Sequence, residues 1–432
     1  MRTFCLLLIV VFFSVGGLMA QPENSGKQTD FYNQKGNMNI PDSFMHKVLA
    51  ANSAFYNSFI AKKDIYKIQV LYTQIDRDKK GQISFTDHSL GLDRDNYFYP
   101  ASTVKLPIAI LALQKLNELK IPGLDRNSTM ITRSAGEMQT AVTNDPSATD
   151  RRPTIAQYIK KILLVSDNDA FNRLYEFLGQ EYINNSLHKM GYDDVQIIHR
   201  LQINLTEEEN RFTNPVQFLD STGKVLFDKP AEKSQFVYAN RNTKLGNGYI
   251  SGDKMINESF DFSKKNRMGL ADLHNIVKSI MFPAAVAEKQ RFNLSQDDYN
   301  FLRRYMSMLA TESVSPVYTA PEYWDTYVKF MLYGAEKGAA KPGIRIFNKP
   351  GDAYGFMIDG TYIVDYKNKV EFIVSAVIYC NSDGIFNDDQ YDYDTVGRPF
   401  FKQLGEILYE YELKRERKFI PDLHSFQYRY DD

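Results

Sequence analysis

Ser102 and Lys105 are the pair whose residue types and spacing most directly indicate chemistry. Three positions apart on a helix, two side chains share one face and lie about one turn apart. A serine hydroxyl is a weak nucleophile until a base takes its proton, and an amine becomes such a base once its pKa falls. Apolar residues such as Val104, Leu106 and Ile108 surround Lys105 in the sequence. We therefore expect this lysine either to be desolvated and functional or to reach water.

The Ser-x-x-Lys pattern is weak on its own, because it also occurs at Ser186-Lys189, Ser221-Lys224 and Ser251-Lys254. The copy at residues 102–105 leads directly into a long apolar helix, which would hold the serine rigidly. The copy at 186–189 ends a helix, and the last two lie in polar, turn-like sequence. The first copy is therefore the candidate nucleophile motif.

Ser166-Asp167-Asn168 is a second candidate group. A buried hydroxyl can relay a proton between a lysine and a reacting nitrogen, and an asparagine amide can hold a substrate carbonyl. The alternative is structural, because Ser or Asp before a helix is ordinarily an N-cap.

Lys349-Pro350-Gly351 is the third group and follows a predicted strand at residues 344–347. A cation at a strand end can bind an acidic group or bias a proton relay, and glycine allows a substrate to approach the backbone closely. The alternative is a surface turn, which is how we interpret Lys341-Pro342-Gly343 just upstream.

The elements that must position these residues form a pattern of strands at both ends and helices between them. Helices are expected at about 42–61, 102–116, 154–163, 167–178, 181–190 and 396–413, and strands at 65–72, from 82, and at 344–347, 355–366 and 370–379. This order predicts an α+β fold, with one antiparallel sheet built from both chain termini and a helical region beside it. Residues 212–266 fit this pattern poorly and are interpreted as an insertion or lid.

Composition narrows the class of protein. The 52 basic and 53 acidic residues balance to a net charge of −1, so no nucleic-acid partner is indicated. Only Cys5 and Cys380 occur, so the chain without its first residues could form no internal disulfide. With 43% hydrophobic residues, the chain is an ordinary globular protein that relies on its core.

The first twenty residues predict a secretory signal peptide. Arg2 precedes an apolar run from Leu6 to Phe13, and small residues lead to Ala20. The run is too short for a permanent membrane span, although an uncleaved anchor is the alternative. We therefore expect an exported, periplasmic or extracellular protein with a flexible leader at 21–40, a folded domain at 41–415 and a tail at 416–432. No second apolar stretch is long enough to cross a membrane.

Taken together and in this order, the three motifs resemble the signature set of class A β-lactamases and penicillin-binding proteins. The segment from Tyr99 to Pro107 resembles the family's nucleophile segment almost throughout, and Asn172 matches a characteristic class A asparagine. The resemblance covers about residues 42–414 apart from the insertion. It implies a β-lactamase/transpeptidase-like fold.

The resemblance also implies a role for each matching residue. Ser102 would attack the substrate carbonyl, with Lys105 as base or relay, and Ser166 would pass the proton to the leaving nitrogen. Asn168 would orient the substrate amide, and Lys349 would support the relay and a substrate carboxylate. The backbone N–H groups of Ser102 and Asp352, beside Gly351, would form the oxyanion hole.

Two positions depart from the family's pattern. Pro350 replaces the usual Thr or Ser, whose hydroxyl contacts the substrate carboxylate in the family. Gln202 aligns with the glutamate that activates the deacylating water, and a neutral amide cannot act as a general base. Glu207, Glu208 and Glu209 follow closely; one could substitute, but three adjacent acids are more typical of a solvated turn.

The expected function is therefore a β-lactamase-related serine hydrolase that forms an acyl-enzyme with a β-lactam or similar amide and releases it slowly. One alternative is a D,D-peptidase-like, penicillin-binding enzyme acting on peptidoglycan stem peptides. Another is a non-catalytic binding module on the same fold. The mechanism requires no cofactor, no metal constellation stands out among the histidines, and the oligomeric state stays open.

Overall fold

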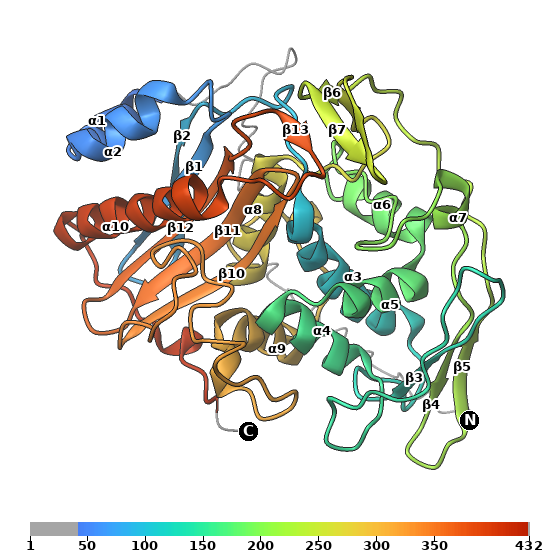
Figure 1. The fold of residues 1–432 in the computed structure, drawn as a ribbon. Helices are drawn as coiled ribbons and strands as arrows, with labels where there is room; N and C mark the ends of the chain where they lie inside the picture. Colours follow the sequence, from blue (N-terminus) through green and yellow to red (C-terminus); the bar gives the residue numbers. More distant parts are fainter. Residues whose placement is uncertain (1–41, 431–432) are drawn as a thin grey trace, which may run out of the picture.

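A computed structural model describes residues 42–430 of the chain. The predicted signal peptide and leader lie outside the described residues. At the centre is a five-stranded antiparallel sheet in the order β10-β11-β12-β1-β2 (Figure 1). Its strands are β1 (Gln69–Arg77), β2 (Ile83–Leu90), β10 (Ile344–Ala353), β11 (Phe356–Asp365) and β12 (Val370–Tyr379). Strands from both ends of the chain thus share one sheet, and the α+β prediction is confirmed.

Both faces of the sheet are covered by helices. On one face lie α1 (Ser43–Leu49), α2 (Ser53–Ser58) and α10 (Arg398–Lys414), and on the other lie α8 (Leu270–Met281) and α9 (Gln296–Ser307) (Figure 1). Residues alternate between the two cores along β1: Val70 and Tyr72 belong to one hydrophobic cluster, and Leu71 belongs to the other. Burial on both faces explains the uninterrupted apolar run Val70-Leu71-Tyr72 in this strand.

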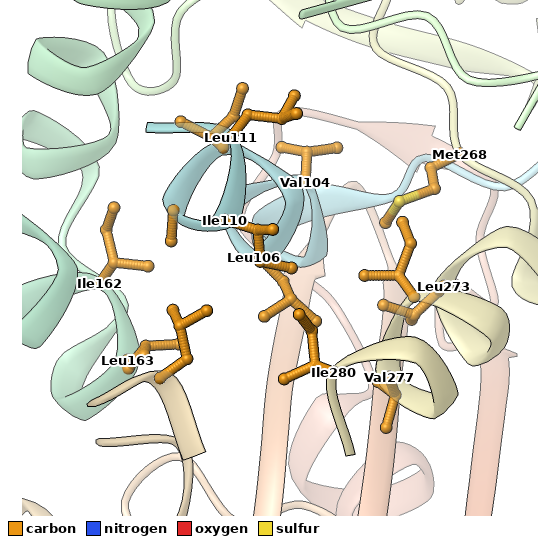
Figure 2. Close-up of a cluster of buried hydrophobic side chains, with 14 of the residues drawn as sticks. Val104, Leu106, Ile110, Leu111, Ile162, Leu163, Met268, Leu273, Val277 and Ile280 are labelled. Carbon is orange, nitrogen blue, oxygen red and sulfur yellow. The ribbon is translucent and has the colours of Figure 1, made fainter. Parts of the chain in front are cut away.

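The helical region is built around α3 (Lys105–Leu119), beside α4 (Ile155–Val165), α5 (Asn168–Leu178) and α6 (Gln180–Lys189). A helix that is apolar all round is a buried helix, and α3 is buried from Lys105 through Gln114. Figure 2 shows its side chains between those of α4 on one side and α8 on the other, with Ile162, Leu163, Leu273, Val277 and Ile280 labelled. This packing fixes the start of α3, where the nucleophile motif lies.

Two expectations about the elements were wrong. The single helix expected at 42–61 is divided into α1, α2 and a short 3-10 helix, Ile60–Lys62. The break falls at Asn52, whose side chain accepts a hydrogen bond from Phe55 N (3.0 Å) and caps α2, as a short polar residue favours. The first strand begins at Gln69 rather than at 65, because residues 63–67 form turns and Lys67 has a φ of +46°.

A third correction concerns Lys349, which lies within β10 and not beyond the end of a strand. The strand continues through Pro350 to Ala353. Proline is tolerated because β10 is an edge strand of the sheet, where a missing backbone donor need not break the ladder.

Residues 212–266 divide into two parts. β4 (Val216–Leu219) and β5 (Val225–Lys229) extend β3 (Thr129–Thr132) into a three-stranded sheet. Farther along, β6 (Lys244–Leu245) pairs with β9 (Phe260–Asp261), and β7 (Gly248–Ser251) pairs with β8 (Lys254–Ile256) and β13 (Ile385–Phe386). β13 follows β12 in the chain, so its pairing with β7 joins the second part to the segment after β12.

The remaining elements are α7 (Glu207–Arg211), the 3-10 helices Ala101–Val104, Glu288–Gln290, Ala310–Glu312 and His424–Phe426, and a π-helical turn, Tyr393–Gly397. Within residues 42–430, no helix combines the length and apolarity that a membrane span needs.

Candidate active site

Ser102 lies in the 3-10 turn Ala101–Val104, which leads directly into α3. Ala101 has a left-handed φ of +48°, an unusual conformation for a residue with a side chain. The turn is held on one side by buried α3. Ser102 itself is half-buried and lines a pocket of about 680 Å³. The candidate nucleophile is therefore rigid and open to a ligand.

Lys105 is fully buried and reaches the other candidate residues. Its Nζ lies 2.9 Å from Ser102 Oγ, 3.1 Å from Ser166 Oγ and 2.7 Å from Asn168 Oδ1, and it also contacts the Ser166 carbonyl. Burial lowers the pKa of Lys105 well below its ordinary value, and the positive charge of Lys349 lowers it further. The neutral amine is thereby favoured, which is the form that can accept the Ser102 proton.

The second motif lies at the junction of α4 and α5. Asp167 caps α5, with Oδ1 accepting a hydrogen bond from Ala170 N at 2.7 Å. The N-cap interpretation thus applies to Asp167 and leaves the side chains of Ser166 and Asn168 directed at Lys105. Ser166 has a left-handed φ of +62°, and such sparsely populated backbone conformations cluster at functional sites.

Lys349 completes the group from β10. Its Nζ donates to Ser166 Oγ at 2.9 Å and to the Pro350 carbonyl at 2.6 Å. Burial lowers the pKa of Lys349 to about 7, opposed by the charges of Asp359 and Asp352. Ser166 therefore lies between two amines and can pass a proton from one to the other.

Gly351 brings β10 against the nucleophile turn. A Cβ placed on it would lie 2.6 Å from Ser102 N and 2.9 Å from Thr103 N, so no side chain fits. This close approach sets the main chain of Asp352 beside that of Ser102, where the resemblance expects an oxyanion hole.

Gln202 lies in the pocket beside Asn168. Its Oε1 accepts a hydrogen bond from Asn168 Nδ2 at 2.7 Å. The loop is held from beneath by Asn172, which donates to Leu201 O (3.0 Å) and accepts from Leu201 N (2.9 Å). The position aligned with the family's glutamate is thus at the site and holds a neutral amide.

The three following acids are engaged elsewhere. Glu209 forms a capping box with Thr206 at the start of α7. Glu207 pairs with Arg211 and Lys264, and Glu208 pairs with Lys233. None of the three lines the pocket that contains Ser102. The three acids thus begin the helix α7 and do not form the turn expected from the sequence, but they lie away from the pocket as expected.

The far wall of the pocket holds residues that the sequence reasoning did not single out. Tyr249, Phe260 and Lys265 come from the segment at 212–266, and Tyr354 follows β10. No motif marks them. Only the fold places the rings of Tyr249, Phe260 and Tyr354 beside the nucleophile.

The model of a family described as "Beta-lactamase enzyme family" matches residues 56–235, which include Ser102, Lys105, Ser166 and Gln202. No curated protein matches the chain. Similar solved structures include a β-lactamase from Sphaerobacter thermophilus (12% identity, 85% of this chain, 97% of that chain, TM-score 0.44). Others are a class A β-lactamase from Clostridium kluyveri (14%, 84%, 98%, 0.46) and a β-lactamase from Burkholderia phymatum (13%, 84%, 98%, 0.45).

Residues 56–235 of this chain, which carry the first two motifs and Gln202, thus match the model of the β-lactamase enzyme family.

Proposed function

We propose that this protein is a serine hydrolase that is acylated at Ser102 by β-lactams or similar amides and deacylates slowly. The observation that supports this best is the chain of contacts of 2.9 to 3.1 Å that joins Ser102, which lines the pocket, to Lys105, Ser166 and Lys349 behind it. The signal peptide predicted at residues 1–20 makes export part of the same proposal.

In acylation, Lys105 takes the proton of the Ser102 hydroxyl while Oγ forms a bond to the substrate carbonyl carbon. The oxyanion that develops is stabilised by the backbone N–H groups of Ser102 and Asp352. The carbon–nitrogen bond then breaks, and the proton passes from Lys105 through Ser166 to the leaving nitrogen. Because Ser166 Oγ contacts both Lys105 and Lys349, it is suited to this relay.

Deacylation requires a base that activates water, and the aligned position holds Gln202. An amide cannot take a proton from water at neutral pH. Asp352 is the acid among the described residues that line the pocket, but it lies on β10 and interacts with the charges of Lys105, Lys349 and Arg398. The acyl-enzyme is therefore expected to persist.

Intact-protein mass spectrometry after incubation with benzylpenicillin tests the proposal. We expect an adduct of the mass of one penicillin, and we expect none in Ser102→Ala. Failure to form an adduct with any β-lactam or fluorophosphonate would instead favour a binding module. Release of D-alanine from a stem peptide, with little cephalosporin turnover, would favour the peptidase.

Gly351→Ala tests the proposed oxyanion hole. The new Cβ would collide with main-chain atoms, so β10 must move away from Ser102. Loss of one oxyanion donor ordinarily slows such reactions by about 10²- to 10³-fold, and we expect adduct formation to slow in that range. Gly136→Ala is the control, because nothing lies within 4 Å of its added Cβ. Equal rates in the two variants would contradict the assignment.

A further inference from the structure

An aromatic wall closes the side of the pocket formed by residues 249–265 and Tyr354. Tyr249 packs edge-on against Phe260, with ring centroids 5.1 Å apart, and Phe260 stacks on Tyr354 at 5.6 Å. Tyr354 in turn packs against Tyr99 at 4.9 Å, three residues before the nucleophile. The wall is thus continuous with the catalytic turn.

Lys265 is the cation of this wall. Its Nζ lies 5.6 Å from the Phe260 ring centroid and 5.9 Å from that of Tyr354. Within residues 42–430, no carboxylate forms an ion pair with it. Desolvation lowers the pKa of Lys265, and no acid opposes that effect. The adjacent Lys264 differs, because it is exposed and pairs with Glu207.

A half-buried ammonium without an anionic partner is unfavourable, since burial weakens its hydration and nothing replaces it. Cation–π contacts offset part of this effect at an exposed or half-exposed site. A cation left in this condition on a pocket wall is a candidate for binding an anionic ligand group.

The charges near Ser102 indicate where that anion would not lie. Pro350 lacks the hydroxyl that the resemblance associates with a substrate carboxylate. Asp352 lies on the same strand; burial raises the pKa of its carboxyl, and the charges of Lys349, Arg398 and Lys105 oppose that rise. Beside β10 one contact to a carboxylate is therefore missing, and Lys265 offers a cation for a further carboxylate at the aromatic wall.

We propose that Lys265 binds an anionic group carried on the acyl side chain of the substrate, so that the preferred acyl donors bear a carboxylate away from the reacting carbonyl. This inference rests on the proposed function for the reaction itself. With the substrate amide at Asn168, the side chain would extend past Gln202 along the aromatic wall, where the pocket is open.

Binding to Ser102→Ala protein tests this without acylation. The ligands are benzylpenicillin and carbenicillin, which differ by one carboxylate on the acyl side chain, and affinity is measured by titration calorimetry. We expect carbenicillin to bind about tenfold more tightly or better, as a charge-assisted contact predicts. Lys265→Met should abolish the difference, and Lys265→Arg should retain it.

Lys264→Met is the matched control, because it removes the same charge from the neighbouring residue, and it should retain the difference. Equal affinities for the two ligands, a difference that survives Lys265→Met, or no binding of either would overturn the inference. Failure of the proposed function is read separately, as the absence of a Ser102 adduct in the unmodified protein.

Discussion

Lys105→Met is expected to slow formation of the Ser102 adduct by about 10²- to 10⁴-fold, the range for loss of a general base. Methionine is unbranched and only one atom shorter than lysine, so it keeps most of the packing, but it cannot take the proton from Ser102 Oγ, which lies 2.9 Å from Nζ. Adduct formation is followed by mass spectrometry at several penicillin concentrations. In the unmodified protein the rate should fall as pH decreases, because protonation removes the base, and this dependence should disappear in the variant.

Lys115→Met is the control for this experiment. Lys115 also lies on α3, and its Nζ donates to the carbonyls of Phe177 and Leu178 instead of to the site. Both variants lose a lysine from the same helix, so a shared loss of thermal stability is separated from a loss of chemistry. Equal adduct rates in the two variants would contradict the role of Lys105.

Much of the fold and the four candidate catalytic residues could be predicted from the sequence, because local patterns carry them. The apolar helix after Ser102 and the strands at both ends are visible as hydrophobic runs. The motif order then implied that three distant segments meet. Ser166 could not be distinguished from an N-cap, since its orientation depends on a left-handed φ of +62° at the end of α4, which the sequence does not signal.

The pocket wall was not predictable, for a physical reason. Phe260 and Lys265 lie in short strands and turns whose positions are set by contacts with residues more than one hundred positions away, such as the pairing of β7 with β13. The strand predicted at residues 344–347 continues through Pro350 to Ala353, and proline is tolerated there because β10 is an edge strand. Only the sheet order shows that β10 is such a strand.

Gln202→Glu is expected to convert slow release of the acyl group into rapid turnover. The new carboxylate keeps an oxygen that can accept the hydrogen bond from Asn168 Nδ2, now made to Gln202 Oε1 at 2.7 Å, so the loop need not move. A carboxylate at this point can take a proton from water, which a neutral amide cannot. We expect the adduct to decay about 10²- to 10³-fold faster, the contribution typical of general-base catalysis.

Decay of the mass adduct after removal of free penicillin measures this rate, and turnover of a chromogenic cephalosporin measures it independently. Gln202→Met removes the oxygen that accepts the hydrogen bond from Asn168 Nδ2 and adds no base. It therefore separates the effect of changed loop contacts from the effect of a new base. Its adduct should not decay faster than that of the unmodified protein. Glu209→Gln tests the neighbouring acids and should also leave decay unchanged, because that carboxylate caps α7.

If the unmodified protein already turns over cephalosporin rapidly, and does so in the Glu207→Gln, Glu208→Gln and Glu209→Gln variants, the proposal of slow release is wrong. A rapid decay that slows in Asp352→Asn would move the base from the Gln202 loop to β10. The contrast between these variants depends on one proposal: Gln202, which lines the pocket on a loop held by Asn172, takes the place of the carboxylate that the resemblance assigns to water activation.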